Sequence, residues 1–364
     1  MENLEKYLED LESRIDDEIE NDLMQQWKDF TDGKFQGNVF SPNRKKASKP
    51  KVEWPKIMVN DTLNDIDNMV LQQYELCSKA LEAGNGEILS VRCNFGTGII
   101  PSLFGAELFI MPYETDTLPA SRSLPGGKED IKKLIDKGVP DLYQNLGGKV
   151  FEVAERFLSI AKQYPKIGRH VHIYAPDTQG PMAICQSLWG SGIFFDFYDD
   201  KKLVHEMLNL ATETFIAFTK EWFKLVPSVM EGYCINWCML HKGHVMLRDD
   251  DAMNLSPDMF EEFIRPYDQR ILDEFGGGGI HFCGKGDHYI HIIPQMRGVY
   301  VINLSQPECN NMDIIYKHTV EKGIKIIGLK KEEVERALKK GFDFHGNVHV
   351  GASIAAWDKK PQAN

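Results

Sequence analysis

From Glu87 onward, short apolar runs alternate with longer amphipathic segments, and this alternation restricts the fold more than any other feature. The runs predict strands at Ile88–Cys93, Glu107–Met111, Val171–Ala175, Ile193–Tyr198, Val229–Ile235, Gly279–Cys283, Val299–Leu304 and Ile324–Leu329, with a shorter run at Phe344–Val350. Because the runs are apolar throughout, they indicate a parallel sheet covered on both faces. We therefore expect an α/β fold, a TIM (β/α)8 barrel. A doubly wound open sheet is the alternative, although Asn94–Gly98 matches its glycine fingerprint only in part.

Three stretches predict helices between or after the strands. An apolar stripe over Lys201–Leu225 recurs at helical spacing, and Lys330–Lys340 is a shorter helix. Ser256 followed by proline predicts an N-cap and the start of a helix over 257–275. Pro266 inside that stretch should kink it.

The first 84 residues differ from the rest and predict an N-terminal helical extension before a barrel over 85–364. Leucine and isoleucine recur every three or four residues over 1–30, which predicts an amphipathic helix. A loop rich in Gly, Pro and Lys follows over 32–55, and a second helix is expected over 64–81. The extension either caps the main domain or serves as a dimerisation arm, which makes a homodimer an open alternative.

Composition excludes several classes of function. The chain has 364 residues, and 42 Lys and Arg against 54 Asp and Glu give a net charge of −12. This charge argues against binding to nucleic acid or to an anionic membrane surface. No apolar run is long enough to span a membrane, and the acidic N-terminus lacks a signal sequence, so we expect a soluble, cytoplasmic protein. Its seven cysteines are then expected to be thiols.

The best candidate for chemistry is the strand that ends in His281-Phe282-Cys283. Residues two apart on a strand face the same way, so the imidazole and the thiol project together. They form a metal pair for which Zn²⁺ is the expected ion. Glu308 or Cys309, after the next strand, offers a third ligand. The alternative is a buried cysteine beside a hydrogen-bonded histidine.

Other polar residues follow predicted strands. Asp249, Asp250 and Asp251 repel one another, so at least one should face a polar site or a cation, and we take Asp251 as a catalytic candidate. A solvated loop is the alternative. Gln179 is placed to hydrogen-bond a substrate, and Arg92 to clamp an anion.

Several stretches together resemble the uroporphyrinogen decarboxylase superfamily over about residues 85–355. They are Phe197–Val204, Leu255–Phe263, Pro266-Tyr267, Arg270-Ile271, His281–Gly284 and Asn303–Pro307. The resemblance implies a barrel with one of two chemistries. One is cofactor-free decarboxylation of uroporphyrinogen, and the other is zinc-dependent methyl transfer between a corrinoid and a thiol.

Two departures bear on the choice of branch. Where the decarboxylases carry two arginines that bind substrate carboxylates, this chain keeps Arg92 alone, and its net charge of −12 also disfavours a polycarboxylate tetrapyrrole. The methyltransferase branch resembles this chain through His281 and Cys283. Its third zinc ligand, a cysteine after the last strand, has no counterpart here, and the corresponding region offers His345 or His349.

The leading hypothesis is therefore zinc-assisted methyl transfer to a thiol from a small donor or from a corrinoid, which a partner protein would carry. Arg92, Asp116, Gln179 and Gln306 are the expected substrate-binding residues, and His281 and Cys283, with Cys309 or His349, the expected zinc ligands. The second hypothesis is decarboxylation of a carboxylated small molecule by Arg92 with Asp116 or Asp177. The third is a barrel that binds a corrinoid or tetrapyrrole without reaction.

Overall fold

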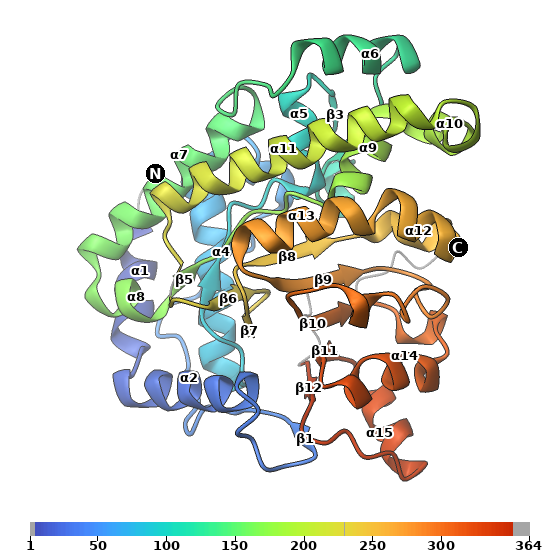
Figure 1. Ribbon diagram of the computed structural model, residues 1–364. Helices are drawn as coiled ribbons and strands as arrows, with labels where there is room; N and C mark the ends of the chain where they lie inside the picture. The colour runs from blue at the N-terminus through green and yellow to red at the C-terminus, as the bar shows by residue number, and fades with distance from the viewer. Residues whose placement is uncertain (1–3, 229, 352–364) are drawn as a thin grey trace.

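The computed structural model describes residues 4–228 and 230–351 and has a mixed α/β architecture (Figure 1). Its central sheet has six strands in the order β1-β12-β11-β10-β9-β8. Their bounds are Val39–Phe40 (β1), Val245–Arg248 (β8), Gly278–Phe282 (β9), Val299–Leu304 (β10), Lys325–Leu329 (β11) and Val348–Val350 (β12). Every neighbouring pair in this sheet is parallel, as the apolar strands predict.

A second parallel pair joins β2 (Ser90–Val91) to β5 (His172–Ile173). It lies outside the six-stranded sheet, and a bond from the Gly180 N–H to the Arg248 carbonyl (2.9 Å) connects the segment after β5 to β8. Within the described residues, hydrogen-bonded strand pairing therefore forms two parallel groups.

The predicted strand over Ile193–Tyr198 is wrong, because this run is helical in α10 (Ile193–Asp199). Ile193 and Phe197 are buried, whereas Phe195 and Tyr198 are 72% and 76% exposed, which is the spacing of a helix with one buried face. A six-residue apolar run does not by itself distinguish a strand from a short helix.

Two other predicted strands form antiparallel hairpins outside the parallel sheet. One pairs β3 (Leu108–Phe109) with β4 (Ala120–Ser121), and the other pairs β6 (Tyr233–Asn236) with β7 (Met239–Lys242). Val229, where the second predicted strand begins, lies outside the described residues, as does the segment 352–364 of the expected barrel domain. Sequence reasoning also missed β8, whose four residues end in a charged side chain.

Three of the helices lie where the sequence predicts them. Helices α4 (Ile66–Ala83), α11 (Lys201–Leu225) and α15 (Lys331–Lys339) all lie where expected. The helix expected over 257–275 divides into α12 (Pro257–Phe263) and α13 (Arg265–Phe275) next to Pro266. The remaining helices are α3 (Val59–Thr62), α5 (Ile99–Leu103), α6 (Lys128–Lys137), α7 (Leu146–Gln163), α8 (Pro165–His170), α9 (Pro181–Trp189) and α14 (Met312–His318). No helix in the described ranges is long and apolar enough to cross a membrane.

The N-terminal stretch forms α1 (Leu4–Arg14) and α2 (Asp17–Thr31) rather than one helix. Asp16 interrupts them because its carboxylate accepts hydrogen bonds from the backbone N–H groups of Glu18 and Ile19, at 3.0 and 3.2 Å, and so caps α2.

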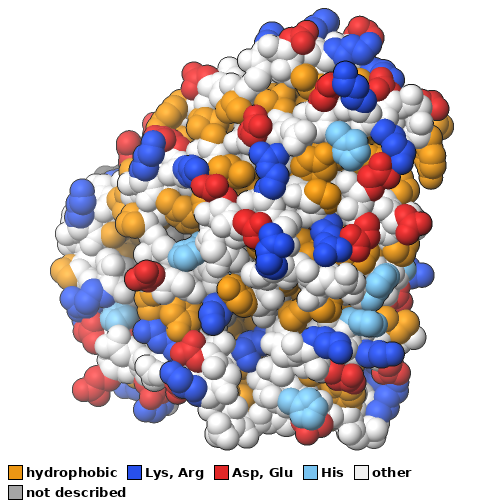
Figure 2. All heavy atoms as spheres, in the orientation of Figure 1, with side chains coloured by type: hydrophobic (Ala, Val, Ile, Leu, Met, Phe, Trp, Pro, Cys, Tyr) orange, Lys and Arg blue, Asp and Glu red, His pale blue; other side chains and the backbone are white. Residues whose placement is uncertain are grey.

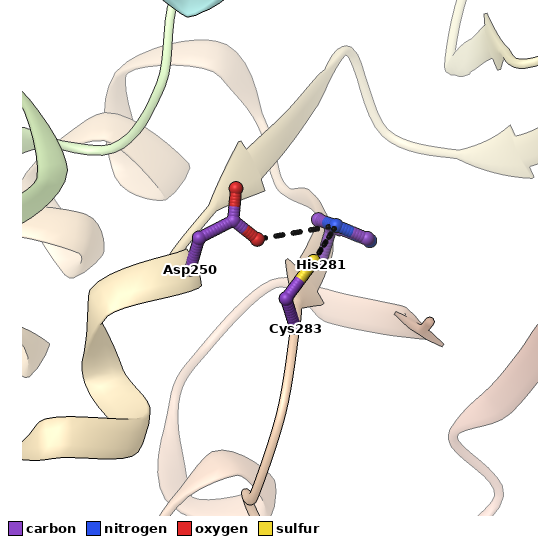
Figure 3. Close-up of side chains that lie close together, drawn as sticks. All are labelled: Asp250, His281 and Cys283. Carbon is purple, nitrogen blue, oxygen red and sulfur yellow. Dashed lines mark hydrogen bonds and ion pairs between the residues drawn. The ribbon is translucent and has the colours of Figure 1, made fainter. Parts of the chain in front are cut away.

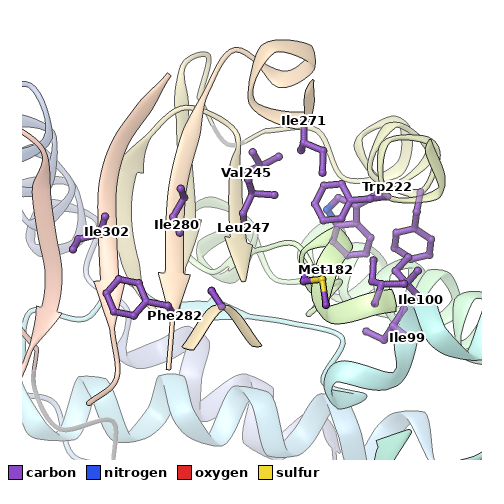
Figure 4. Close-up of a cluster of buried hydrophobic side chains, with 14 of the residues drawn as sticks. Ile99, Ile100, Met182, Trp222, Val245, Leu247, Ile271, Ile280, Phe282 and Ile302 are labelled. Atoms are coloured by element: carbon purple, nitrogen blue, oxygen red, sulfur yellow. The ribbon is translucent and has the colours of Figure 1, made fainter. Parts of the chain in front are cut away.

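The two faces of the sheet contribute to two separate cores. Val245, Leu247, Ile280 and Phe282 belong to the larger core, which they form with helical side chains such as Trp222 of α11 (Figure 4). The alternate residues of these strands face the other side of the sheet, as the period of two requires. This side packs against α2 and the β6–β7 hairpin, and we call it the interior side.

The interior core, on this second side of the sheet, is the smaller of the two. Its side chains change from apolar to polar toward the carboxyl ends of the strands. Met246, Val301 and Ile327 pack there against Trp27 and Phe30 of α2, and against the β6–β7 hairpin. The carboxyl ends of the strands add polar side chains to the same side, and these form the candidate site.

Candidate metal centre

Three polar side chains lie in register across neighbouring strands at the carboxyl end of the sheet. Arg248 of β8 pairs with His281 of β9, and His281 pairs with Asn303 of β10. All three are buried on the interior side, because Leu247, Ile280 and Phe282 occupy the alternate positions on the helix-covered face.

His281, Cys283 and Asp250 converge at this place (Figure 3). The Nε2 atom of His281 lies 3.3 Å from Oδ1 of Asp250 and 3.5 Å from Sγ of Cys283. One ligand atom from each residue falls within 4.8 Å of the others. Nitrogen, sulfur and carboxylate oxygen are the ligand types that Zn²⁺ takes, and three protein ligands with an open fourth position are typical of a catalytic zinc site.

Asn303 orients the imidazole of His281. Its Nδ2 group donates to the Ile327 carbonyl (2.7 Å), so its Oδ1 atom accepts from the Nδ1–H of His281 (2.6 Å). The Nε2 lone pair then faces Asp250 and Cys283, as metal binding requires. Gly328 makes room for this amide, since a Cβ atom there would lie 2.9 Å from Nδ2 of Asn303.

Replacing Asn303 with alanine should weaken zinc binding by roughly 10- to 100-fold, because the imidazole loses the acceptor that sets its tautomer and orientation. Competition with a chromogenic zinc chelator measures the effect. Asn209→Ala on the exposed face of α11 is the matched control. Equal zinc affinity in wild type and Asn303→Ala would contradict the orienting role.

Electrostatics couple the members of the triad. Burial alone would lower the pKa of His281, but the Asp250 carboxylate and Cys283 raise it to about 10. Burial acts to raise the pKa of Asp250, but the hydrogen bond and charge of His281, together with Cys283 and Arg248, lower that pKa below its ordinary value. A metal at this site must therefore displace a proton from the imidazole.

The two carboxylates beside Asp250 behave differently from it. Burial, and then the negative charge of Asp250, raise the pKa of Asp251 to about 6. Burial also raises the pKa of Asp249 to about 7 and that of its neighbour Asp268 on α13 well above the ordinary range. The acidic run therefore does include a carboxylate that faces a polar site, and it is Asp250.

A buried cluster of Arg92, Asp177, Gln179 and Arg248 lies beside the triad residues. Asp177 accepts a hydrogen bond from Nε2 of Gln179 (2.8 Å) and lies 3.2 Å from Nε of Arg248 and 3.8 Å from Nη1 of Arg92. The structure thus brings together three residues that the sequence singles out and adds Arg248. Two guanidinium groups therefore lie close to one carboxylate beside the candidate metal centre.

Trp237 connects the two clusters from the tip of the β6–β7 hairpin. Its ring lies 4.9 Å from that of His281, and the Arg248 guanidinium lies 5.0 Å from it on a ring face. Trp237 and Cys238 have φ values of +47° and +63°, which a two-residue type I′ hairpin turn requires and which non-glycine residues adopt rarely. Sequence reasoning missed Trp237, because a Trp-Cys pair is no recognised two-residue turn signal.

Neither Cys309 nor His349, the two expected further zinc ligands, joins the triad. Cys309 is exposed in the turn Pro307–Cys309. His349 is buried with its ring 4.5 Å from Trp27, and its Nδ1 atom accepts the N–H of Gly328 (3.1 Å). The carboxylate of Asp250, two residues after β8, lies beside His281 and Cys283 instead, because β8 pairs with β9.

Two residues expected to bind substrate have backbone partners. The Gln306 side chain accepts the N–H of Gly284 (2.6 Å), so it holds the loop that follows β9. Asp116 accepts the N–H of Val59 (2.9 Å) and lies 3.7 Å from Lys56, so it ties its loop to the N-terminal part of the chain. Their expected contacts with substrate remain predictions.

His349 should make the protein less stable in acid. Burial lowers its pKa to about 3, so between pH 6.5 and 3 the unfolded chain binds a proton at His349 that the folded chain does not. Its contribution is present above pH 6.5 and is lost as pH falls, by about 2 kcal/mol between pH 7 and 5. Urea unfolding at both values should show a smaller loss for His349→Gln than for wild type, and equal losses would contradict the assignment.

Comparisons with known proteins bear on the fold. No protein family model matches the chain, and no curated protein matches its sequence. Among solved structures, a methyltransferase from Methanosarcina mazei is similar, with a TM-score of 0.59 and 16% sequence identity over 83% of each chain. At this identity the similarity shows a shared fold, which extends over most of both chains.

Proposed function

We propose that this protein is a zinc-dependent methyltransferase of the uroporphyrinogen decarboxylase-like type, which moves a methyl group from a corrinoid or a small donor to a thiol. The observation that carries the proposal is the convergence of Asp250, His281 and Cys283 on one point. Zinc fits these residues, because the donor set is of the right chemistry and Asn303 already directs Nε2 of His281 toward the other two ligand atoms.

Each residue has a defined part in this proposal. Asp250 and the Cys283 thiolate would neutralise the two positive charges of zinc, and neutral His281 would add a nitrogen ligand. When bound, zinc would lower the pKa of the acceptor thiol and so supply a nucleophile near neutral pH. In the transfer a carbon–sulfur bond forms, the bond from the methyl group to its donor breaks with both electrons staying on the donor, and the thiol proton passes to solvent.

The neighbouring side chains would position the acceptor. Arg92 and Arg248 both lie beside Asp177, so their guanidinium groups would orient an acceptor that carries an anionic group. Trp237 would cover the imidazole side of the site and exclude water. The methyltransferase similarity in fold supports the same assignment, in which β2 and β5 would complete a (β/α)8 barrel with the six-stranded sheet.

Incubation of the zinc-loaded protein with methylcobalamin and a panel of thiols tests the proposal. We expect loss of the methylcobalamin absorbance, with a thioether identified by mass spectrometry, and faster reaction of thiols that carry a carboxylate or sulfonate. Absence of stoichiometric zinc after reconstitution, or absence of any thioether with free or protein-bound methylcorrinoid, would overturn it.

The two buried guanidinium groups of Arg92 and Arg248 also favour a second candidate, decarboxylation of a carboxylated small molecule. Release of CO₂ from uroporphyrinogen or a smaller carboxylate by metal-free protein would identify this activity. A shift in corrinoid absorbance without any product would instead identify a binding protein without catalysis.

A further inference from the structure

A cavity opens at the opposite end of the strands from the metal centre. Its volume is about 340 Å³, and it is lined by the last turn of α2 and by residues at the start of β10 and β11. This volume lies within the range of sites that bind small molecules.

Three lysines, Lys242, Lys322 and Lys325, line the cavity, and we call it the lysine pocket. Within the described ranges, none of the three ammonium groups lies within 4 Å of a carboxylate, unlike those of Lys128 and Lys201. The carboxylate of Asp32 also lines the pocket, but it accepts the Tyr233 hydroxyl (2.7 Å) and lies 3.1 Å from Lys34.

Lys325 is held in place by neutral groups. Its ammonium donates to Oδ1 of Asn347 (3.0 Å) and lies 4.8 Å from the centre of the Phe30 ring. Lys325 is half-buried, and burial lowers its pKa against the smaller opposing effect of the Asp32 carboxylate. A cation in such surroundings, beside two further lysines, is stabilised by an anion that enters the pocket.

Aromatic surface accompanies the lysines. The register between β9 and β10 shifts between Val299 and Val301, and the residue between them, Tyr300, lines the pocket. Gly277 permits this, since a Cβ atom there would lie 2.6 Å from the Tyr300 ring. The Lys242 ammonium lies 5.2 Å from the centre of the same ring.

The charge balance of the lysine pocket is unusual for this chain. The net charge is −12, and Figure 2 shows acidic and basic side chains interspersed over one face of the molecule. Three lysines around one cavity suit a dianion better than a monocarboxylate, and lysine binds phosphate as a compact point charge.

We propose that the lysine pocket binds a small phosphate monoester with a planar ring. The phosphate would lie among Lys242, Lys322 and Lys325, and the ring against the exposed face of Tyr300. The pocket lies away from the metal centre, so this inference is independent of the proposed methyl transfer.

Calorimetric titration of the full chain with AMP, adenosine and pyrophosphate tests the proposal, since the last two each lack one half of the recognised chemistry. We expect saturable AMP binding that is tighter than that of either fragment. Lys325→Met and Lys322→Met should each weaken AMP binding by roughly 10-fold or more. Lys322 is exposed, so its replacement leaves the fold intact.

Lys137→Met, on exposed α6, and His281→Ala, at the metal centre, are the controls and should bind AMP as wild type does. Absence of saturable AMP binding would overturn the proposal. Equal AMP and adenosine affinities would overturn it as well, and so would AMP affinity unchanged in both pocket variants.

Discussion

His281→Ala is expected to remove stoichiometric zinc from the purified protein and to abolish methyl transfer. The imidazole is the central member of the triad, with Asp250 at 3.3 Å and Cys283 at 3.5 Å from its Nε2 atom. Without it, two adjacent anionic ligands would remain, and a two-ligand site holds zinc far more weakly than a three-ligand site. Elemental analysis after dialysis against a weak chelator gives the zinc content directly.

Matched variants separate the triad from the other residues that the sequence offers as ligands. Cys283→Ser and Asp250→Asn should lose zinc, whereas Cys309→Ser, His345→Ala and His349→Gln should retain it, because these three side chains lie outside the triad. Zinc loss in Cys309→Ser or His349→Gln with retention in Asp250→Asn would show that the ligand set is wrong. Circular dichroism of each variant distinguishes loss of a ligand from loss of fold.

Trp27→Ala should lower the free energy of unfolding by about 3–5 kcal/mol, the largest stability effect that we expect from one substitution. The Trp27 side chain is fully buried in the interior core, where its ring contacts those of Phe40 and His349. Its Nε1–H also donates to the Gly86 carbonyl (2.8 Å). Truncation would leave a large cavity and a carbonyl without its partner.

Urea unfolding followed by far-ultraviolet circular dichroism measures this loss, with half-buried Trp54→Ala as the control expected to cost less. The same experiment tests the role of the N-terminal extension. A dimerisation arm predicts that Trp27→Ala changes the sedimentation coefficient with little change in stability. That outcome would contradict the view that α2 completes the interior core.

Local patterns in the sequence were sufficient for several features of the fold. The parallel strands β9, β10 and β11 and the helix α11 follow from apolar periodicity, which depends only on residues close in the chain. The approach of His281 and Cys283 follows from the two-residue period of a strand. The helix α10 was missed because one short apolar run satisfies both periods.

The third member of the candidate site depended on strand pairing. Asp250 lies beside His281 because β8 pairs with β9, with Arg248 opposite His281. Sequence reasoning missed β8, and so selected Asp251 from the acidic run and looked for the third ligand in Cys309 or His349. The place of Trp237 was equally invisible, since it depends on a hairpin whose tip reaches residues more than forty positions away.

What the sequence determined by itself is therefore the α/β class, the helices α4 and α11, and the pair of His281 and Cys283, all set by spacing along the backbone. The tertiary structure alone decided that Asp250 completes the triad, that α2 fills the interior and that three lysines surround one cavity. The physical reason is that these features depend on which distant segments come together, and burial and pairing energies over the whole chain determine that choice.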